Sequence, residues 1–126
     1  MSYLYDPENI FAKILRGEIP NDTILETDHA LAFRDIAPKR KEHILVIPKG
    51  PYVSYDHFCK AATDAEMIGF NKAVAEVVDK LNLALDRGQG FRVVANSGEH
   101  GLQEVPHMHF HILGGEFVGA MVSPYE

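Results

Sequence analysis

The clearest pattern of apolar positions along the chain is that of a helix beginning at residue 63. Thr63 and Glu66 have the spacing of a capping box, in which each side chain accepts from the other residue's backbone amide. Apolar residues then recur at intervals of three and four, the period of an amphipathic helix. They are Met67, Phe70, Val74, Val77, Val78 and Leu81. The pattern predicts a helix to about Leu83 with this stripe facing a core.

A shorter helix is predicted near the N-terminus. Asp6 and Pro7 have the order of an N-cap and a first helical residue, and Gly17 is suited to the helix end. Four apolar residues between them, Ile10, Phe11, Ile14 and Leu15, recur at helical spacing.

Short apolar runs predict the strands of a sheet. Thr23–Glu26 and Ala30–Arg34 flank a polar turn and indicate a hairpin, and His43–Ile47 and Phe91–Ala95 are further strands. Residues 105–115 form the last strand. Because the links between strands are short, we expect an α+β fold with a five-stranded antiparallel sheet and two helices.

Three histidines alternate in the last strand. In a strand, successive side chains point to opposite faces, so His107, His109 and His111 are predicted to share one face. Their neighbours Met108, Phe110 and Ile112 are predicted to face a core. Imidazole ordinarily titrates near neutral pH and serves proton transfer, metal binding and nucleophilic attack.

Composition narrows the setting of this strand. The 126 residues fit one domain spanning 1–126, and the net charge of −6 argues against nucleic acid or an anionic membrane held by bulk electrostatics. Cys59 is the only cysteine, so no internal disulfide forms and a reducing compartment is expected. Neither a signal peptide nor a run of roughly 20 apolar residues is evident, and a cytoplasmic location is therefore expected.

Three interpretations of the histidines are open. They are solvated or packed side chains, a metal site, or a covalent catalyst. His-X-His pairs bind zinc, copper or iron, but the first and third histidines of a strand lie roughly 14 Å apart, too far to share one ion directly. Two of them with His43 would meet this geometric demand. Nevertheless no metal and no cofactor is expected.

Covalent catalysis at phosphorus is the interpretation that the neighbouring sequence favours. A histidine nucleophile divides one difficult step into two, and backbone amides and protonated imidazoles are suitable donors to phosphate oxygens. The polar loop Asn96–Glu104 leads directly into the histidine strand. It contains Ser97, Gly98 and Gly101, as anion-binding loops do.

The segment His-Met-His-Phe-His-Ile-Leu (107–113) resembles the motif of the histidine triad (HIT) nucleotide hydrolases and transferases. Residues 10–20, 32–36 and 43–49 are similar to further family segments in the right order, so the resemblance covers roughly residues 9 to 115. Gly114-Gly115 after the triad is typical of the nucleotide-binding branch, which includes purine nucleoside phosphoramidases.

The resemblance implies a role for each matched residue. His109 corresponds to the nucleophile, and His107 and His111 to flanking groups that orient it and contact phosphate. His43 completes the cluster, and Asp35 binds the ribose hydroxyls. Further nucleotide-binding positions are Asn96 in the phosphate loop, Ile10, Phe11, Phe33 and Ile36 around the base, Gln103 near the scissile bond, and Val105. Without the resemblance, Asp35 and Asn96 are also explained by turn chemistry, and Ile10 and Phe11 as core.

Two departures from the family pattern leave the substrate open. Glu104 stands where the branch often has a small hydroxyl residue, on the leaving-group side. A carboxyl there protonates a departing amine if its pKa is raised, and repels phosphate if it is ionised. Residues 117–126 also differ from the aromatic tail that the resemblance associates with eukaryotic members.

The implied function is hydrolysis of the phosphorus–nitrogen bond at the α-phosphate of a purine nucleotide conjugate. The family chemistry proceeds through a nucleotidyl-histidine and releases AMP or GMP, and the resemblance implies a homodimer. A dinucleoside-polyphosphate hydrolase or nucleotidyltransferase is the alternative enzyme. A nucleotide-binding adaptor without catalysis is the alternative of another class.

Overall fold

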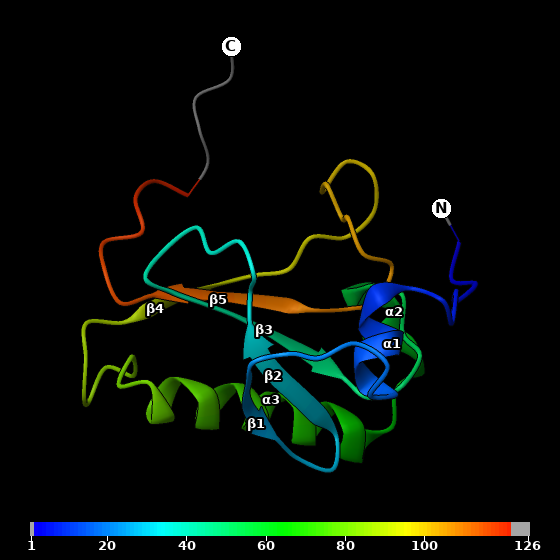
Figure 1. Cartoon of the computed structure of the whole chain (residues 1–126), viewed down its shortest axis with the longest axis horizontal. Helices are drawn as coiled ribbons and strands as arrows, with labels where there is room; N and C mark the ends of the chain where they lie inside the picture. The colour runs from blue at the N-terminus through cyan, green and yellow to red at the C-terminus, as the bar shows by residue number, and fades with distance from the viewer. Residues whose placement is uncertain (1, 122–126) are drawn as a thin grey trace.

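One antiparallel sheet organises the chain, of which the computed structural model describes residues 2–121 (Figure 1). Its strands are β1 (Thr23–Glu26), β2 (Ala30–Arg34), β3 (Glu42–Pro48), β4 (Phe91–Val94) and β5 (Phe110–Gly114). They lie in the order β1-β2-β3-β5-β4, and every neighbouring pair is antiparallel. The predicted hairpin and five-stranded antiparallel sheet are therefore confirmed.

The central strand β3 separates two apolar layers. Ile44 and Val46 point to the layer that contains α3 (Asp64–Lys80), whereas Leu45 and Ile47 point to the opposite layer. A strand with apolar residues at successive positions is buried on both faces, which is why β3 lies in the middle of the sheet.

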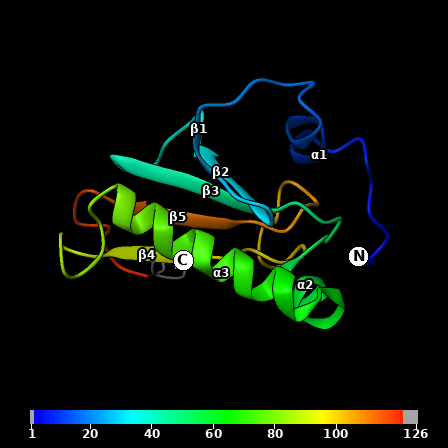
Figure 2. The ribbon, with the colours of Figure 1, turned by 90° about the horizontal axis from the view of Figure 1, so that it is seen from below.

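The long helix α3 covers one face of the sheet (Figure 2). Its capping box between Thr63 and Glu66 is present in both directions. The residues of α3 that are buried are Phe70, Ala73, Val77 and Val78. The helix ends three residues before the predicted Leu83, because Asn82 adopts a left-handed backbone (φ 58°) that a helix cannot continue through.

The N-terminal helix α1 (Ile10–Leu15) packs on the other face through Phe11 and Ile14. The predicted N-cap, Asp6, is wrong. Asp6 accepts from the amide of Glu8 in a turn, and Asn9 caps the helix by accepting from the amide of Ala12 (2.9 Å). Asp and Asn are both common N-cap residues, and Asp6 and Asn9 lie only three positions apart. The local sequence is therefore compatible with a helix that begins after either residue.

A third helix, α2 (Tyr55–Ala61), was not predicted, so the expectation of two helices is wrong. It spans seven residues and buries only Phe58. A helix this short gives no recognisable apolar stripe in the sequence. Ser54 provides its N-cap.

The last strand is shorter than predicted, because β5 begins at Phe110 and not at residue 105. Pro106 has no amide hydrogen, and the amide of Met108 donates to the carbonyl of Tyr52 (2.7 Å) outside the sheet. His107 and His109 thus lie in an irregular segment before β5, and only His111 is a strand residue. Met108, Phe110 and Ile112 do pack in the core beneath α3, as predicted.

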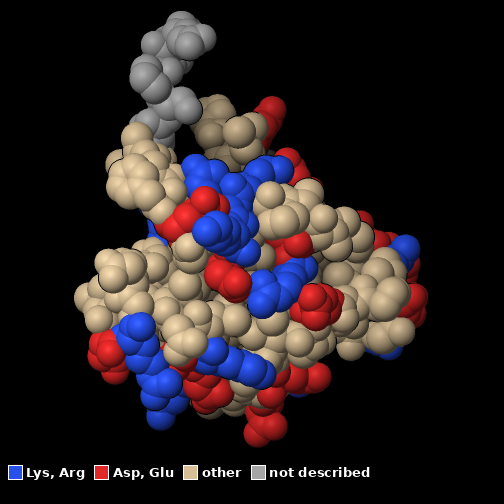
Figure 3. All heavy atoms as spheres, turned by 60° about the vertical axis from the view of Figure 1, so that its left-hand side comes forward, with Lys and Arg blue, Asp and Glu red and all other residues tan. Residues whose placement is uncertain are grey.

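Two arginines hold the segment after β5. Arg40 donates to the carbonyl of Val118 (2.7 Å), and Arg92 to those of Gly119 (2.7 Å) and Ala120 (3.2 Å). On the face that Figure 3 presents, basic side chains are interspersed with acidic ones. The last five residues of the predicted tail, 122–126, lie outside the described residues. Within residues 2–121, no helix is both long and apolar enough to cross a membrane.

Candidate active site

Four histidines gather on the sheet face opposite α3. His43 on β3 and His111 on β5 have ring centroids 5.2 Å apart, and the ring of His109 lies 5.1 Å from that of His111. His107 is fully buried behind His109, and His43 and His109 are also buried. The fold therefore brings together all four histidines that the sequence selected.

The hydrogen bond of His109 determines which of its nitrogens is free. Its Nδ1 lies 2.6 Å from the carbonyl oxygen of His107. Because a carbonyl can only accept, Nδ1 carries the proton, and the neutral ring keeps its lone pair on Nε2. The Phe11 ring packs perpendicular to the imidazole, with the two centroids 5.0 Å apart. His109 thus presents an unprotonated Nε2, the form needed for nucleophilic attack.

A hydrogen-bond chain also orients His111. The amide of Lys39 donates to His43 Nδ1 (3.1 Å), so the proton of neutral His43 is on Nε2. That Nε2 lies 2.9 Å from His111 Nδ1 and 3.4 Å from the Asp35 carboxylate. His43 Nε2 donates to the nearer of these two groups, His111 Nδ1. Because Nδ1 accepts, the proton of neutral His111 is on Nε2. His111 then has an N–H group to offer to an anion.

His107 differs from the other three because both of its ring nitrogens are engaged. Nε2 lies 2.8 Å from the carbonyl oxygen of Pro48, and Nδ1 lies 2.6 Å from the hydroxyl of Tyr5. The resemblance implied that His107 both orients the nucleophile and contacts phosphate. In this arrangement no nitrogen of His107 is left for phosphate, and its carbonyl orients His109.

Burial lowers the pKa of each of these histidines. The pKa of His107 falls to about 4, and that of His111 also to about 4, where neighbouring His109 and His43 add to the burial effect. Burial also lowers the pKa values of His43 and His109, against the opposing charge of Asp35. The rings are therefore neutral at pH 7. Protonated imidazoles were expected as donors to phosphate oxygens, but the donors in this site are neutral N–H groups.

Stability is expected to fall as the solution is acidified. The unfolded chain binds a proton at His107 near pH 6.5, whereas the folded chain resists it down to about pH 4. The stabilisation from neutral His107 is therefore complete above pH 6.5 and is lost as the pH falls from 6.5 towards 4. By pH 5 this single group removes about 2 kcal/mol from the free energy of unfolding.

Urea denaturation at pH 8 and pH 5 measures this loss. His107→Gln, which cannot titrate, is expected to be less stable at pH 8 but to lose less stability on acidification. Equal losses in the two proteins would show that His107 does not cause the dependence.

The predicted apolar walls separate into two kinds. Phe11 and Phe33 are buried and meet edge to face, with centroids 5.6 Å apart, as part of the apolar layer on this face. Ile10 is 45% exposed and Ile36 99% exposed, so both have surface available for a ligand. Val105 packs half-buried against the same apolar layer.

Asp35 follows β2 and uses its two carboxylate oxygens differently. Oδ1 accepts from the amide of Ala37 (2.8 Å), which is the turn role that the sequence left open, and Oδ2 faces His43. The side chain is 19% exposed. Ligand atoms of Asp35, His43 and His111 lie within 4.8 Å of one another. Among residues 2–121, the group arranged so that it could hold a metal ion is this trio, and not two triad histidines with His43.

The polar loop before the triad is held closed by Gln103. Its amide nitrogen donates to the carbonyls of Val53 (2.6 Å) and Val105 (3.0 Å), and its amide oxygen accepts from the amide of Gly98 (3.0 Å). These bonds make Gln103 a brace for the loop. Asn96 stands half-buried at the loop's start.

The loop contains one strained residue, next to Gln103. Leu102 has φ 58°, a left-handed backbone that costs free energy for a residue with a Cβ. Glu104 follows with an exposed side chain, and its negative charge opposes the effect of burial on the pKa of His109. The Glu104 carboxylate therefore lies near enough to the His109 ring to influence it.

Comparison with known proteins identifies the family of this chain. The family described as the HIT domain matches residues 16–118. A HIT-like protein of Azospirillum brasilense is 50% identical over 123 residues, covering 98% of both chains. The purine nucleoside phosphoramidase of Escherichia coli K12 is 38% identical over 117 residues, covering 92% of this chain and 94% of its own.

Solved structures give the same result. A histidine triad protein from Clostridium difficile superposes with a TM-score of 0.76 at 35% identity, covering 98% of this chain and all of its own. A HIT family hydrolase from Legionella pneumophila superposes with a TM-score of 0.75 at 32% identity, covering 87% and 95%. The chain belongs to the HIT family.

Proposed function

We propose that the protein hydrolyses purine nucleoside phosphoramidates, cleaving the phosphorus–nitrogen bond at the α-phosphate. The observation that carries the proposal is the arrangement at His109, whose Nδ1–H is fixed on the His107 carbonyl so that Nε2 is unprotonated. The similarity to the Escherichia coli purine nucleoside phosphoramidase supports the choice of substrate.

In the first step, the Nε2 lone pair of His109 attacks the α-phosphorus. A nitrogen–phosphorus bond forms while the bond to the amine breaks, and the amine leaves with the electron pair and takes up a proton from solvent. The His111 N–H and the loop amides donate to the non-bridging oxygens, where charge is concentrated. The imidazolium of the adduct keeps its Nδ1–H on the His107 carbonyl.

In the second step, water attacks the phosphorus of the nucleotidyl-histidine. The bond to His109 Nε2 breaks, the water proton passes to solvent, and the nucleoside monophosphate leaves. The second step returns His109 to its starting tautomer, because the His107 carbonyl accepts Nδ1–H throughout. The protein's own N–H groups supply the donors in each step.

The nucleoside is assigned to the surface beside α1. We place the base against exposed Ile10 and Ile36, with Phe11 behind them, and the ribose hydroxyls on Asp35. Asn96 and the loop amides are assigned to the phosphate. Glu104 is assigned to the leaving-group side, because its exposed carboxylate lies close enough to act on His109.

The substrate is tested by steady-state turnover of adenosine phosphoramidate and of a diadenosine polyphosphate. We expect kcat/KM for the phosphoramidate to be greater by at least about tenfold, equal to roughly 1.4 kcal/mol in transition-state stabilisation. The reverse order would assign the protein to dinucleoside-polyphosphate hydrolysis. Binding of AMP without turnover of either compound would instead indicate an adaptor.

Glu104→Gln serves as a companion variant in the same assay. It retains the size of the side chain and removes its charge. If Glu104 lies on the leaving-group side, the variant changes the ratio of the two rates; an unchanged ratio would remove it from that side.

We propose further that two copies of the chain associate along β4. This strand is one edge of the sheet, and within residues 2–121 it pairs only with β5. Phe91 and Val93 on it remain 40% and 38% exposed, so a second β4 would cover apolar surface and satisfy free backbone groups. Sedimentation equilibrium that gives the mass of one chain would refute this association.

A further inference from the structure

Tyr5 lies in the N-terminal segment before α1, yet its hydroxyl reaches the buried histidine of the triad. Tyr5 Oη is 2.6 Å from His107 Nδ1, and the two rings meet edge to face with centroids 5.5 Å apart. His107 has no exposed surface, whereas Tyr5 is half-buried. The hydroxyl thus supplies the partner of a nitrogen that has no access to water.

The direction of this hydrogen bond follows from the other side of the ring. His107 Nε2 lies 2.8 Å from the carbonyl oxygen of Pro48, which can only accept, so Nε2 carries the proton. On a neutral ring, Nδ1 then has the lone pair, and the Tyr5 hydroxyl donates to it. Tyr5 and the Pro48 carbonyl therefore fix both the tautomer and the rotation of the imidazole.

The same residue supplies the acceptor that orients the nucleophile. The His107 amide donates to the Val105 carbonyl (2.8 Å), and its carbonyl accepts from His109 Nδ1 at 2.6 Å. Movement of the His107 ring is therefore transmitted to the backbone carbonyl that holds the His109 tautomer.

We propose that Tyr5 is a positioning residue for the nucleophile, acting through His107. Its hydroxyl fixes the His107 ring, and the fixed His107 carbonyl directs His109 Nε2 towards phosphorus. This inference rests on the proposed function of His109. It also extends the working site to the segment that precedes α1.

Removing the hydroxyl leaves a buried nitrogen without a donor. The ring of His107 then either keeps an unsatisfied Nδ1 or changes to the other tautomer, with the proton on Nδ1. In that tautomer the lone pair of Nε2 faces the lone pairs of the Pro48 carbonyl oxygen, which is repulsive. Either outcome disturbs the alignment of His109 but removes no contact with substrate. We therefore expect Tyr5→Phe to lower kcat about tenfold and to leave KM within about twofold.

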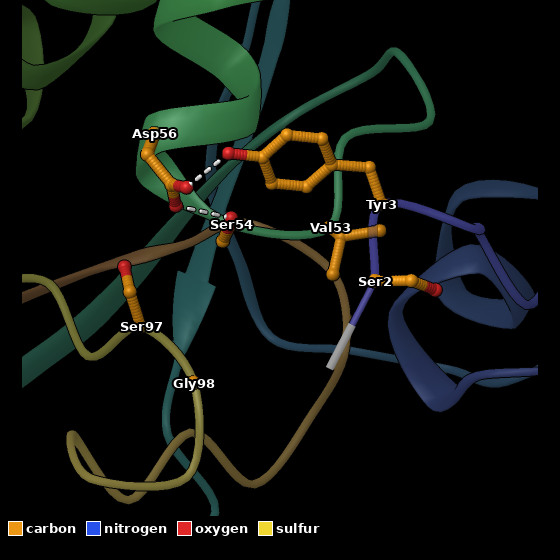
Figure 4. A pocket seen from close by; sticks show the side chains of 7 residues that line it. All are labelled: Ser2, Tyr3, Val53, Ser54, Asp56, Ser97 and Gly98. Carbon is orange, nitrogen blue, oxygen red and sulfur yellow. Dashed lines mark hydrogen bonds between the residues drawn. The ribbon is translucent and has the colours of Figure 1, made fainter.

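Tyr3 gives a matched control in the same segment. Its hydroxyl donates to Asp56 and accepts from the ammonium group of Lys60 (3.0 Å), and its ring stacks on His57 with centroids 4.6 Å apart. Figure 4 shows Tyr3 directed at Asp56, in a hollow lined by none of the four clustered histidines. Tyr3→Phe thus removes an equivalent anchor without touching His107, and its kcat is expected to match the wild type.

Nitrogen-15 NMR of the histidine rings provides a readout that does not depend on turnover. In Tyr5→Phe, the Nδ1 signal of His107 and the ring signals of His109 are expected to shift, whereas Tyr3→Phe leaves both unchanged. Unchanged His109 signals in Tyr5→Phe, or an unchanged kcat, would overturn the positioning role. If the wild type turns over neither nucleotide substrate, the proposed function fails, and the His109 signals still decide whether Tyr5 positions that ring.

Discussion

Replacing His109 by alanine is expected to lower phosphoramidate turnover by at least about 10³-fold and to abolish the nucleotidyl adduct. Among the three triad histidines, only His109 has an unprotonated ring nitrogen that is not engaged in a hydrogen bond, namely Nε2. His107 has both nitrogens engaged, and His111 has its proton on Nε2. No neighbour is therefore arranged to replace the missing nucleophile.

Rapid acid quenching of wild-type protein with labelled substrate, followed by peptide mass spectrometry, locates the adduct. His29→Ala is the matched control, since His29 lies in the β1–β2 turn and its ring lies against Gly69 of α3, on the sheet face opposite the cluster. Its turnover is expected to equal that of the wild type. If His109→Ala retained wild-type turnover, the covalent mechanism proposed here would be wrong.

Replacing His111 by alanine is expected to lower kcat by about 10²-fold while the adduct on His109 still forms. The chain of bonds from the Lys39 amide through His43 leaves the His111 proton on Nε2, where it can donate to a phosphate oxygen. Loss of one such donor to developing charge typically costs about 10²–10³ in rate. Because the nucleophile remains, the chemistry slows and does not stop.

His43→Ala tests the chain that orients this donor. It leaves His111 in place but removes the group that holds its tautomer, so the expected loss is smaller than in His111→Ala. Single-turnover measurements of adduct formation compare the two variants. A His43→Ala protein as impaired as His111→Ala would place His43 in direct contact with the substrate and remove it from a purely orienting role.

The elements that could be predicted from the sequence are those with a local pattern long enough to be distinctive. The capping box at Thr63 and the stripe that follows it define α3, and the alternation around His109 separates core from site. The seven-residue α2 offers no such repeat, and it escaped prediction. The start of β5 escaped for another reason, since it depends on the bond from Met108 to the distant carbonyl of Tyr52.

By itself, the sequence determined the α+β architecture, the antiparallel pairing and the family to which the three alternating histidines belong. Only the tertiary structure decided which ring nitrogen of each histidine carries the proton. The Pro48 carbonyl and the Tyr5 hydroxyl set the tautomer of His107. The Lys39 amide, acting through His43, sets that of His111. Alternation along a strand specifies a face, but the proton on each imidazole depends on its partners in three dimensions.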